Sequence, residues 1–169
     1  GLLFVAALLL PLTTFADQDF LPTISIIIDD LGYRKHEDRE ALALPGPVAY
    51  AVLPYGPQTE NVIRIATEKG KDILLHQPMQ PDKENDSLGP GALTVNMNRQ
   101  QFLNTLSTNI RAVPNLIGVN NHMGSLLTRH PSQMRWLMQA IKANRQFYVD
   151  SLTTGDSVVA EVGQKNNTP

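Results

Sequence analysis

The sequence contains no cysteine. No disulfide bond can form within the chain, so its stability must come from a hydrophobic core. The chain has 169 residues, of which 42% are hydrophobic, and this is enough to bury such a core within one domain. The composition therefore predicts a globular protein.

Basic residues are neither abundant nor clustered. Fourteen lysines and arginines stand against sixteen aspartates and glutamates, which gives a formal net charge of −2. No basic run could follow a phosphate backbone, and this argues against nucleic acid as a partner. The sequence also lacks a glycine-rich phosphate loop and a G-x-S-x-G nucleophile elbow, the signatures of two common classes of site.

Charge is absent from the first sixteen residues, which are apolar from Leu2 to Leu12 and then become small and polar. This pattern predicts that residues 1–16 are a signal peptide truncated at its start and cleaved after Ala16. The alternative is an uncleaved anchor, but the apolar run is short and Pro11 interrupts it, so we expect no stable membrane insertion once the signal is cleaved. A periplasmic or otherwise exported protein follows from this interpretation.

The rest of the chain, residues 17–169, is predicted to be one α/β domain. Strand-like runs begin near Ile24, Val48 and Asp72, and a helix over 59–69 ends at Gly70, which is the rhythm of parallel β/α units. Further elements are a helix from 98 to 113, a strand at 117–119, a helix with Ser132 as N-cap and a strand at 147–149. The final residues are turn-forming, so we expect the domain to be incomplete at its C-terminus.

Two stretches lead to more specific expectations. The β-branched run 24–28 is typical of a strand that is covered on both faces. The stretch 77–95 is rich in proline, glycine, aspartate and asparagine and has no periodic pattern. It predicts a long loop, which is either a functional lid or a solvated insertion.

Polar side chains that could act as ligands or bases follow four of the predicted strands. They are Asp29 and Asp30 after the first strand, His76 after the third, Asn120, Asn121 and His122 after the fourth, and Asp150 and Ser151 after the fifth. In parallel β/α folds the carboxyl ends of the strands share one rim, so these residues are expected to converge there. One aspartate and two histidines are suitable ligands for zinc.

Each of these residues also has a purely structural interpretation. Successive strand residues point to opposite faces, so Asp29 and Asp30 share the rim only if the chain has already turned at Asp30. Alternatively, Asp30 caps the next helix and Asp29 makes a structural hydrogen bond. His76 and His122 could likewise be structural. His36 and His130 lack this placement and are expected at the surface.

Taken together, four ordered segments resemble the divergent polysaccharide deacetylase family, which consists of exported bacterial relatives of NodB-type deacetylases. They are Ile28-Asp29-Asp30-Leu31-Gly32, Leu75-His76-Gln77-Pro78-Met79, Asn121-His122-Met123-Gly124-Ser125 and Tyr148-Val149-Asp150-Ser151. The resemblance extends from about Thr23 to Pro169. It implies an incomplete, distorted (β/α) barrel of about seven strands, of which this chain supplies about five.

The resemblance also implies roles for the rim residues. Asp29 would be the catalytic base, Asp30, His76 and His122 would bind a divalent metal, which is usually zinc in such proteins, and Asp150 would orient a ligand or water. The superfamily takes both histidines from one H-x-x-x-H/S stretch, whereas Leu126 stands four positions after His122. The histidines here would therefore come from separate strands. The superfamily's late histidine motif, which supplies an acid, would lie beyond residue 169.

The function implied is that of a metal-dependent hydrolase that removes N-acetyl groups from an envelope polysaccharide or oligosaccharide. An N-acetylated glycan is thus the expected partner. The alternative is a non-catalytic periplasmic glycan-binding or interaction protein that retains the barrel and the metal site. The sequence does not indicate which glycan is bound or the oligomeric state.

Overall fold

The computed structural model describes residues 23–83 and 88–169, and the predicted signal peptide lies outside this range. Strands and helices alternate along the described chain. In order, they are β1 (Ile26–Leu31), α1 (Lys35–Ala41), β2 (Val48–Val52), α2 (Thr59–Glu68), β3 (Ile73–Met79), α3 (Arg99–Ala112), β4 (Gly118–Met123), the 3-10 helix η2 (Leu127–Arg129), α4 (Pro131–Ala143), β5 (Phe147–Val149) and α5 (Val159–Asn166).

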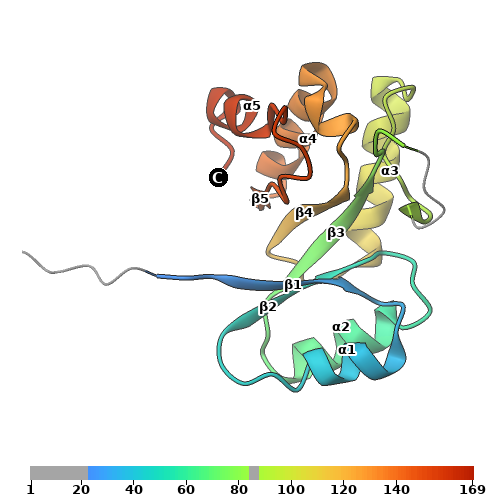
Figure 1. Ribbon diagram of the computed structural model, residues 1–169, viewed down its shortest axis with the longest axis vertical. Helices are drawn as coiled ribbons and strands as arrows, with labels where there is room; N and C mark the ends of the chain where they lie inside the picture. Colours follow the sequence, from blue (N-terminus) through green and yellow to red (C-terminus); the bar gives the residue numbers. More distant parts are fainter. Residues whose placement is uncertain (1–22, 84–87) are drawn as a thin grey trace, which may run out of the picture.

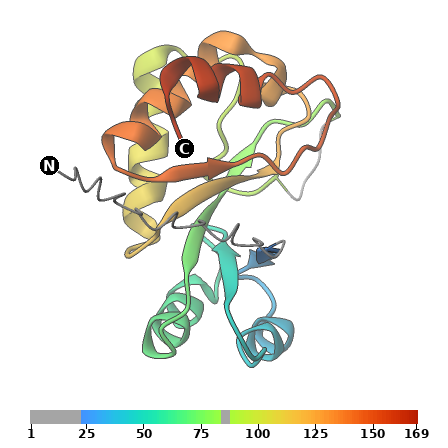
Figure 2. The same ribbon diagram turned by 90° about the vertical axis from the view of Figure 1, so that its left-hand side faces the viewer.

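The five strands form one parallel sheet in the order β1-β2-β3-β4-β5. Because parallel connections are right-handed, this sequential order winds the chain in one direction, as in the wall of a barrel. The wall is open, with β1 and β5 at its two edges. Helices α1 and α2 lie at one end of the molecule and α3, α4 and α5 at the other (Figures 1 and 2). The predicted α/β fold is confirmed.

Local sequence explains where the helices begin and end. Helix α3 begins with a capping box, in which the Asn98 side chain accepts a hydrogen bond from the Gln101 backbone and the Gln101 side chain accepts one from the Asn98 backbone. Helix α2 is followed by Gly70 at φ +62°, which suits the end of a helix. The apolar stripe of α4 is buried, as predicted, and consists of Met134, Leu137, Met138 and Ile141.

Strand β1 differs from the prediction that it is covered on both faces. Ile26, its first residue, is 51% exposed, and Ile24, which precedes the strand, is 86% exposed. The reason is position, because β1 lies at the edge of the sheet whereas the central strand β3 is buried throughout. A β-branched run predicts a strand but does not distinguish an edge from the centre.

The predicted loop 77–95 is also wrong at its start, since β3 continues through Pro78 to Met79. Strand β2 pairs with β3 only as far as Leu75, so the missing N–H of Pro78 interrupts no ladder on that side. The Pro78 carbonyl instead accepts a hydrogen bond from the backbone of Leu93, a fully buried residue that pairs with Met79. Part of the expected loop is therefore attached to the sheet.

The boundaries of two other elements differ slightly from the predicted ones. Strand β4 extends to Met123, beyond the predicted 117–119. Helix α4 begins at Pro131 with His130 as its N-cap, so Ser132 lies within the first turn. Proline suits the first helical position because its fixed φ is already helical.

No described helix combines the length and the apolar character that a membrane span requires.

Candidate metal centre

Asp30 reaches the site through a local reversal of the β1 backbone. It has φ +64°, and the pairing of β1 with β2 shifts register between Ile28 and Leu31. Aspartate tolerates this left-handed conformation better than most residues. The structure thus shows the turn that two neighbouring aspartates need in order to share one rim. The capping alternative is wrong, because the N-cap of α1 is Arg34.

The two histidines come together through the register of β3 and β4. His76 pairs with Asn120, and Pro78 pairs with His122. Alternate residues of a strand share a face, so His76, Asn120 and His122 lie on the same side of the sheet. Asn121 belongs to the other side, where it accepts hydrogen bonds from Tyr148 and Ser151.

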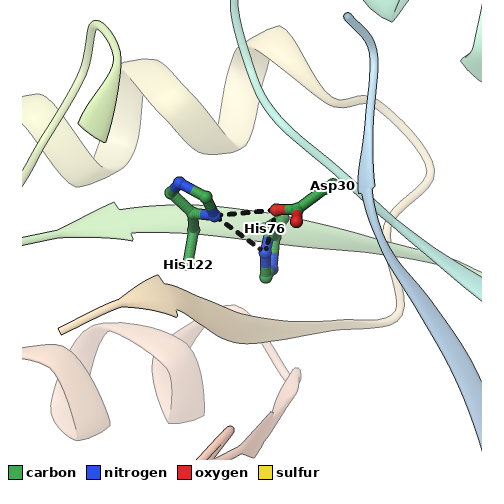
Figure 3. A group of neighbouring side chains, drawn as sticks. All are labelled: Asp30, His76 and His122. Carbon is green, nitrogen blue, oxygen red and sulfur yellow. Dashed lines mark hydrogen bonds and ion pairs between the residues drawn. The ribbon is translucent and has the colours of Figure 1, made fainter. Parts of the chain in front are cut away.

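Three potential ligand atoms from β1, β3 and β4 form a small triangle (Figure 3). Asp30 Oδ1 lies 2.8 Å from His122 Nδ1 and 3.1 Å from His76 Nε2, and the two ring nitrogens are 3.2 Å apart. The His76 side chain is 3% exposed and the Asp30 side chain is 67% exposed. The triangle is therefore anchored in the sheet and open to solvent at its carboxylate.

This donor set suits a divalent metal ion. Zinc binds imidazole nitrogen and carboxylate oxygen at about 2.0–2.2 Å, and catalytic zinc sites combine three such protein ligands with one open position. In a tetrahedral site, bonds of that length put neighbouring ligand atoms roughly 3.3 Å apart, slightly farther than the three distances observed. A small outward movement of the side chains would accommodate the ion. The donor set is compatible with other divalent metals as well.

The charge state of Asp30 also favours the binding of a cation. Hydrogen bonding with the rings of His122 and His76 holds the pKa of the Asp30 carboxyl far below its ordinary value of 3.8, although partial burial opposes this effect. Asp30 is therefore ionised at neutral pH. An ionised carboxylate is the form that binds a metal.

Asp29 lies beside the triangle and is linked to it by Asn120. The Asn120 amide nitrogen donates to Asp29 Oδ1 at 2.8 Å, and Asn120 Oδ1 lies 2.8 Å from His76 Nδ1. Asp29 Oδ1 is 3.9 Å from the same ring nitrogen of His76. The Asp29 side chain is 41% exposed, so water can reach it.

The other predicted site residue, Asp150, and the two other histidines do not belong to this group of three side chains. Asp150 is not among the three grouped residues, and it accepts hydrogen bonds from the Ser157 hydroxyl and the Leu152 backbone. Its role in orienting a ligand or water stays a prediction. His36 is exposed, as expected, and pairs with Glu40 on α1, whereas His130 is half-buried and is the N-cap residue of α4.

A cavity of about 720 Å³ lies beside Asp29, Asp30 and His122. Its wall also includes Tyr33 and Arg34, which follow β1, and Gly89 and Pro90. Sequence reasoning did not identify these wall residues and gave Asn120 no role, although Asn120 stood among the polar residues at a strand end. The pairing of Asn120 with His76 depends on strand register, which no local pattern specifies.

Residues 26–169 match the family described as divergent polysaccharide deacetylase. An uncharacterized protein of Haemophilus influenzae (strain ATCC 51907 / DSM 11121 / KW20 / Rd) is 35% identical over 142 residues, which are 84% of this chain and 50% of that relative. The uncharacterized protein YibQ of Escherichia coli (strain K12) is 32% identical over 141 residues, 83% of this chain and 44% of YibQ. The chain thus spans about half the length of these curated relatives.

A solved structure shares the fold. The crystal structure of the uncharacterized protein ATU2773 from Agrobacterium tumefaciens C58 superimposes with a TM-score of 0.81 over 86% of this chain and 60% of that one, at 20% sequence identity. The likeness at this identity concerns the fold alone. It supports the description of the open sheet as part of an incomplete barrel.

Proposed function

The chain belongs to the divergent polysaccharide deacetylase family, and on this premise we propose that it is a metal-dependent hydrolase that removes N-acetyl groups from an envelope polysaccharide or oligosaccharide. The observation that carries the proposal is the meeting of Asp30, His76 and His122 at distances suited to one ion, with a further carboxylate, Asp29, alongside. The resemblance in sequence and the geometry point to the same residues.

Each residue has a distinct task in the proposed reaction. Asp30, His76 and His122 would hold the ion, which when bound would acidify water and draw charge from the acetyl carbonyl. Asp29 would accept a proton as water adds to the carbonyl carbon. The C–N bond then breaks, acetate keeps the oxygen of that water, and the amine nitrogen takes up a proton, which balances the proton that the water lost to Asp29. The products are acetate and a free amino sugar unit.

The cavity beside the metal centre supports a substrate of this class. Its volume of about 720 Å³ lies within the range of small-molecule sites, roughly 300–1,000 Å³. The cavity is bordered by both aromatic and charged side chains, Tyr33 and Arg34, as suits a ligand with apolar ring faces and polar substituents. We place the reaction in the periplasm or another exported location, where envelope glycans are accessible.

The direct test is acetate release from N-acetylated oligosaccharides by the zinc-loaded protein. Asp29→Asn should lower the turnover rate by about 10²–10⁴-fold, the usual contribution of a general base, and should leave zinc bound. Acetate release at the wild-type rate in Asp29→Asn would contradict the role of Asp29.

The metal ligands require a separate measurement. His76→Ala and His122→Ala should each lose bound zinc, measured by elemental analysis after dialysis, whereas the exposed His36→Ala should retain it. A wild-type protein that binds zinc and the oligosaccharide but releases no acetate would favour the alternative, a non-catalytic glycan-binding protein.

A further inference from the structure

We propose that Asn120 is a positioning residue that fixes both the metal ligand His76 and the base Asp29 through the two ends of one amide. The inference rests on the proposed function for Asp29 and on the metal centre for His76. Asn120 itself is not a metal ligand in this arrangement. Its side chain contacts His76 at Nδ1, the ring nitrogen that is not part of the triangle, and the residue is 2% exposed.

The two hydrogen bonds of Asn120 define the orientation of its amide. Its oxygen faces His76 Nδ1 at 2.8 Å and its nitrogen faces Asp29 Oδ1 at 2.8 Å. The reverse orientation would set the amide oxygen against the carboxylate oxygen of Asp29, and neither atom has a proton to donate. The observed orientation is therefore the only one in which both contacts are hydrogen bonds.

This orientation determines which nitrogen of His76 can bind a metal. Because Asn120 contributes an acceptor, His76 Nδ1 must carry a proton. The other nitrogen, Nε2, is the one that faces Asp30 and His122. Second-sphere hydrogen bonds of this kind fix the tautomer and the ring orientation of metal-binding histidines.

The same amide restrains the proposed base. Its N–H group holds Asp29 Oδ1, while the Asp29 side chain remains 41% exposed. The carboxylate therefore has a defined position and still faces water. Asn120 belongs to β4, where it pairs with His76 of β3 and with Val149 of β5, so strand pairing on both sides holds its backbone in place.

Two substitutions at Asn120 separate these tasks. Asn120→Leu removes both hydrogen bonds, and we expect it to weaken zinc binding by about 10–100-fold, as other second-sphere losses do. Asn120→Asp keeps an acceptor for His76 but replaces the donor to Asp29 with a like charge. It should bind zinc more tightly than Asn120→Leu does and lose acetate release.

Zinc affinity is measured by competition with a chromophoric chelator, so this readout does not require turnover. The matched control is Asn109→Leu, because Asn109 is an equally buried asparagine (1% exposed) whose hydrogen bonds go to Gln77, Gly91 and Tyr55. It should bind zinc as the wild type does. A 15N NMR spectrum of the zinc-bound protein should show a protected His76 Nδ1–H in the wild type and in Asn120→Asp, and its loss in Asn120→Leu.

Unchanged zinc affinity in Asn120→Leu, equal losses in both Asn120 variants, or an equal loss in Asn109→Leu would each overturn the inference. A wild-type protein that binds zinc without releasing acetate would instead contradict the proposed function. The affinity comparison would still decide whether Asn120 positions His76, so the two failures are distinguishable.

Discussion

Tyr33 is the aromatic residue best placed to contact a sugar ring. It follows the aspartate pair, lines the cavity with Asp30 and is 44% exposed. Its ring packs against the backbone of Gly56, where an added Cβ would come within 2.9 Å of it. The ring thus packs near Gly56 and stays partly exposed beside the cavity, where an aromatic side chain can pack on the C–H groups of a sugar.

We expect Tyr33→Leu to raise KM for an N-acetylated oligosaccharide by roughly tenfold, equivalent to an aromatic contact of about 1.4 kcal/mol. The turnover rate should change little, because Tyr33 is not a proposed ligand or base. Tyr33→Phe keeps the ring and should keep KM near the wild-type value. Steady-state kinetics check this, and an unchanged KM in Tyr33→Leu would exclude Tyr33 from the binding surface.

The buried carboxyl of Asp38 should make the stability of the protein depend on pH. It is 5% exposed and accepts hydrogen bonds from the backbones of Gly32 and Arg34 in the turn that follows Asp30. Burial raises the pKa of Asp38 above its ordinary value of 3.8, although the two backbone N–H groups oppose the rise. The folded protein therefore holds this proton more tightly than the unfolded chain does.

The sign of the stability effect follows from this difference. The contribution of Asp38 is fully present below about pH 3.8 and is lost as the pH rises through its raised folded-state pKa. Asp38→Asn does not titrate and can still accept both N–H groups. Its free energy of unfolding, relative to the wild type, should therefore increase with pH above about 3.8. Urea unfolding at a series of pH values measures the difference, and a constant difference would contradict the assignment.

At the scale of elements, the bend in β1 decides whether the aspartate pair can function. Asp30 has φ +64°, a conformation that is strained for β-branched residues and tolerated by aspartate and asparagine. Asp30→Asn and Asp30→Val both remove the carboxylate, but only the valine must adopt this conformation against its preference. We expect Asp30→Val to have the lower free energy of unfolding, by about 1–2 kcal/mol. Equal stability of the two variants in urea would show that the bend relaxes.

The elements also show how far local sequence determines this structure. Helix α2 and its glycine end, the buried stripe of α4 and the parallel β/α order were predictable, because amphipathic periodicity and capping are local properties. The exposure of Ile26 and the continuation of β3 through Pro78 were not. Both depend on which strand lies alongside, and that is a property of the assembled sheet.

The same distinction applies to the candidate metal centre. The meeting of Asp30, His76 and His122 could be predicted because each lies near the end of a strand, and parallel strand ends share a rim. The part played by Asn120 could not, since it depends on the pairing of His76 with Asn120 across β3 and β4. A shift of one residue in that register would turn the asparagine away from the site.

For the whole molecule, the candidate metal centre brings together residues from three strands of the sheet. Asp30 comes from β1, beside the end of the molecule that carries α1 and α2, whereas His122 comes from β4, beside α4 and α5 (Figure 1). His76 lies between them on the central strand β3. An ion bound by all three would therefore cross-link the open sheet over four of its strands.

A ligand that binds only the folded state stabilises it by RT ln(1 + [L]/Kd), or about 2.7 kcal/mol at a concentration of 100 Kd. For a chain of this size, that corresponds to a rise in Tm of roughly 5–10 °C. Zinc should therefore raise the Tm measured by calorimetry, and a chelator should reverse the rise. His76→Ala should abolish the zinc-dependent rise in Tm.

The control is Asn98→Ala, which removes the capping box of α3 and lowers stability by about 1 kcal/mol. It should keep the full zinc-dependent rise in Tm, because Asn98 lies outside the candidate metal centre. An equal rise in the wild type and in His76→Ala would place the zinc elsewhere on the protein.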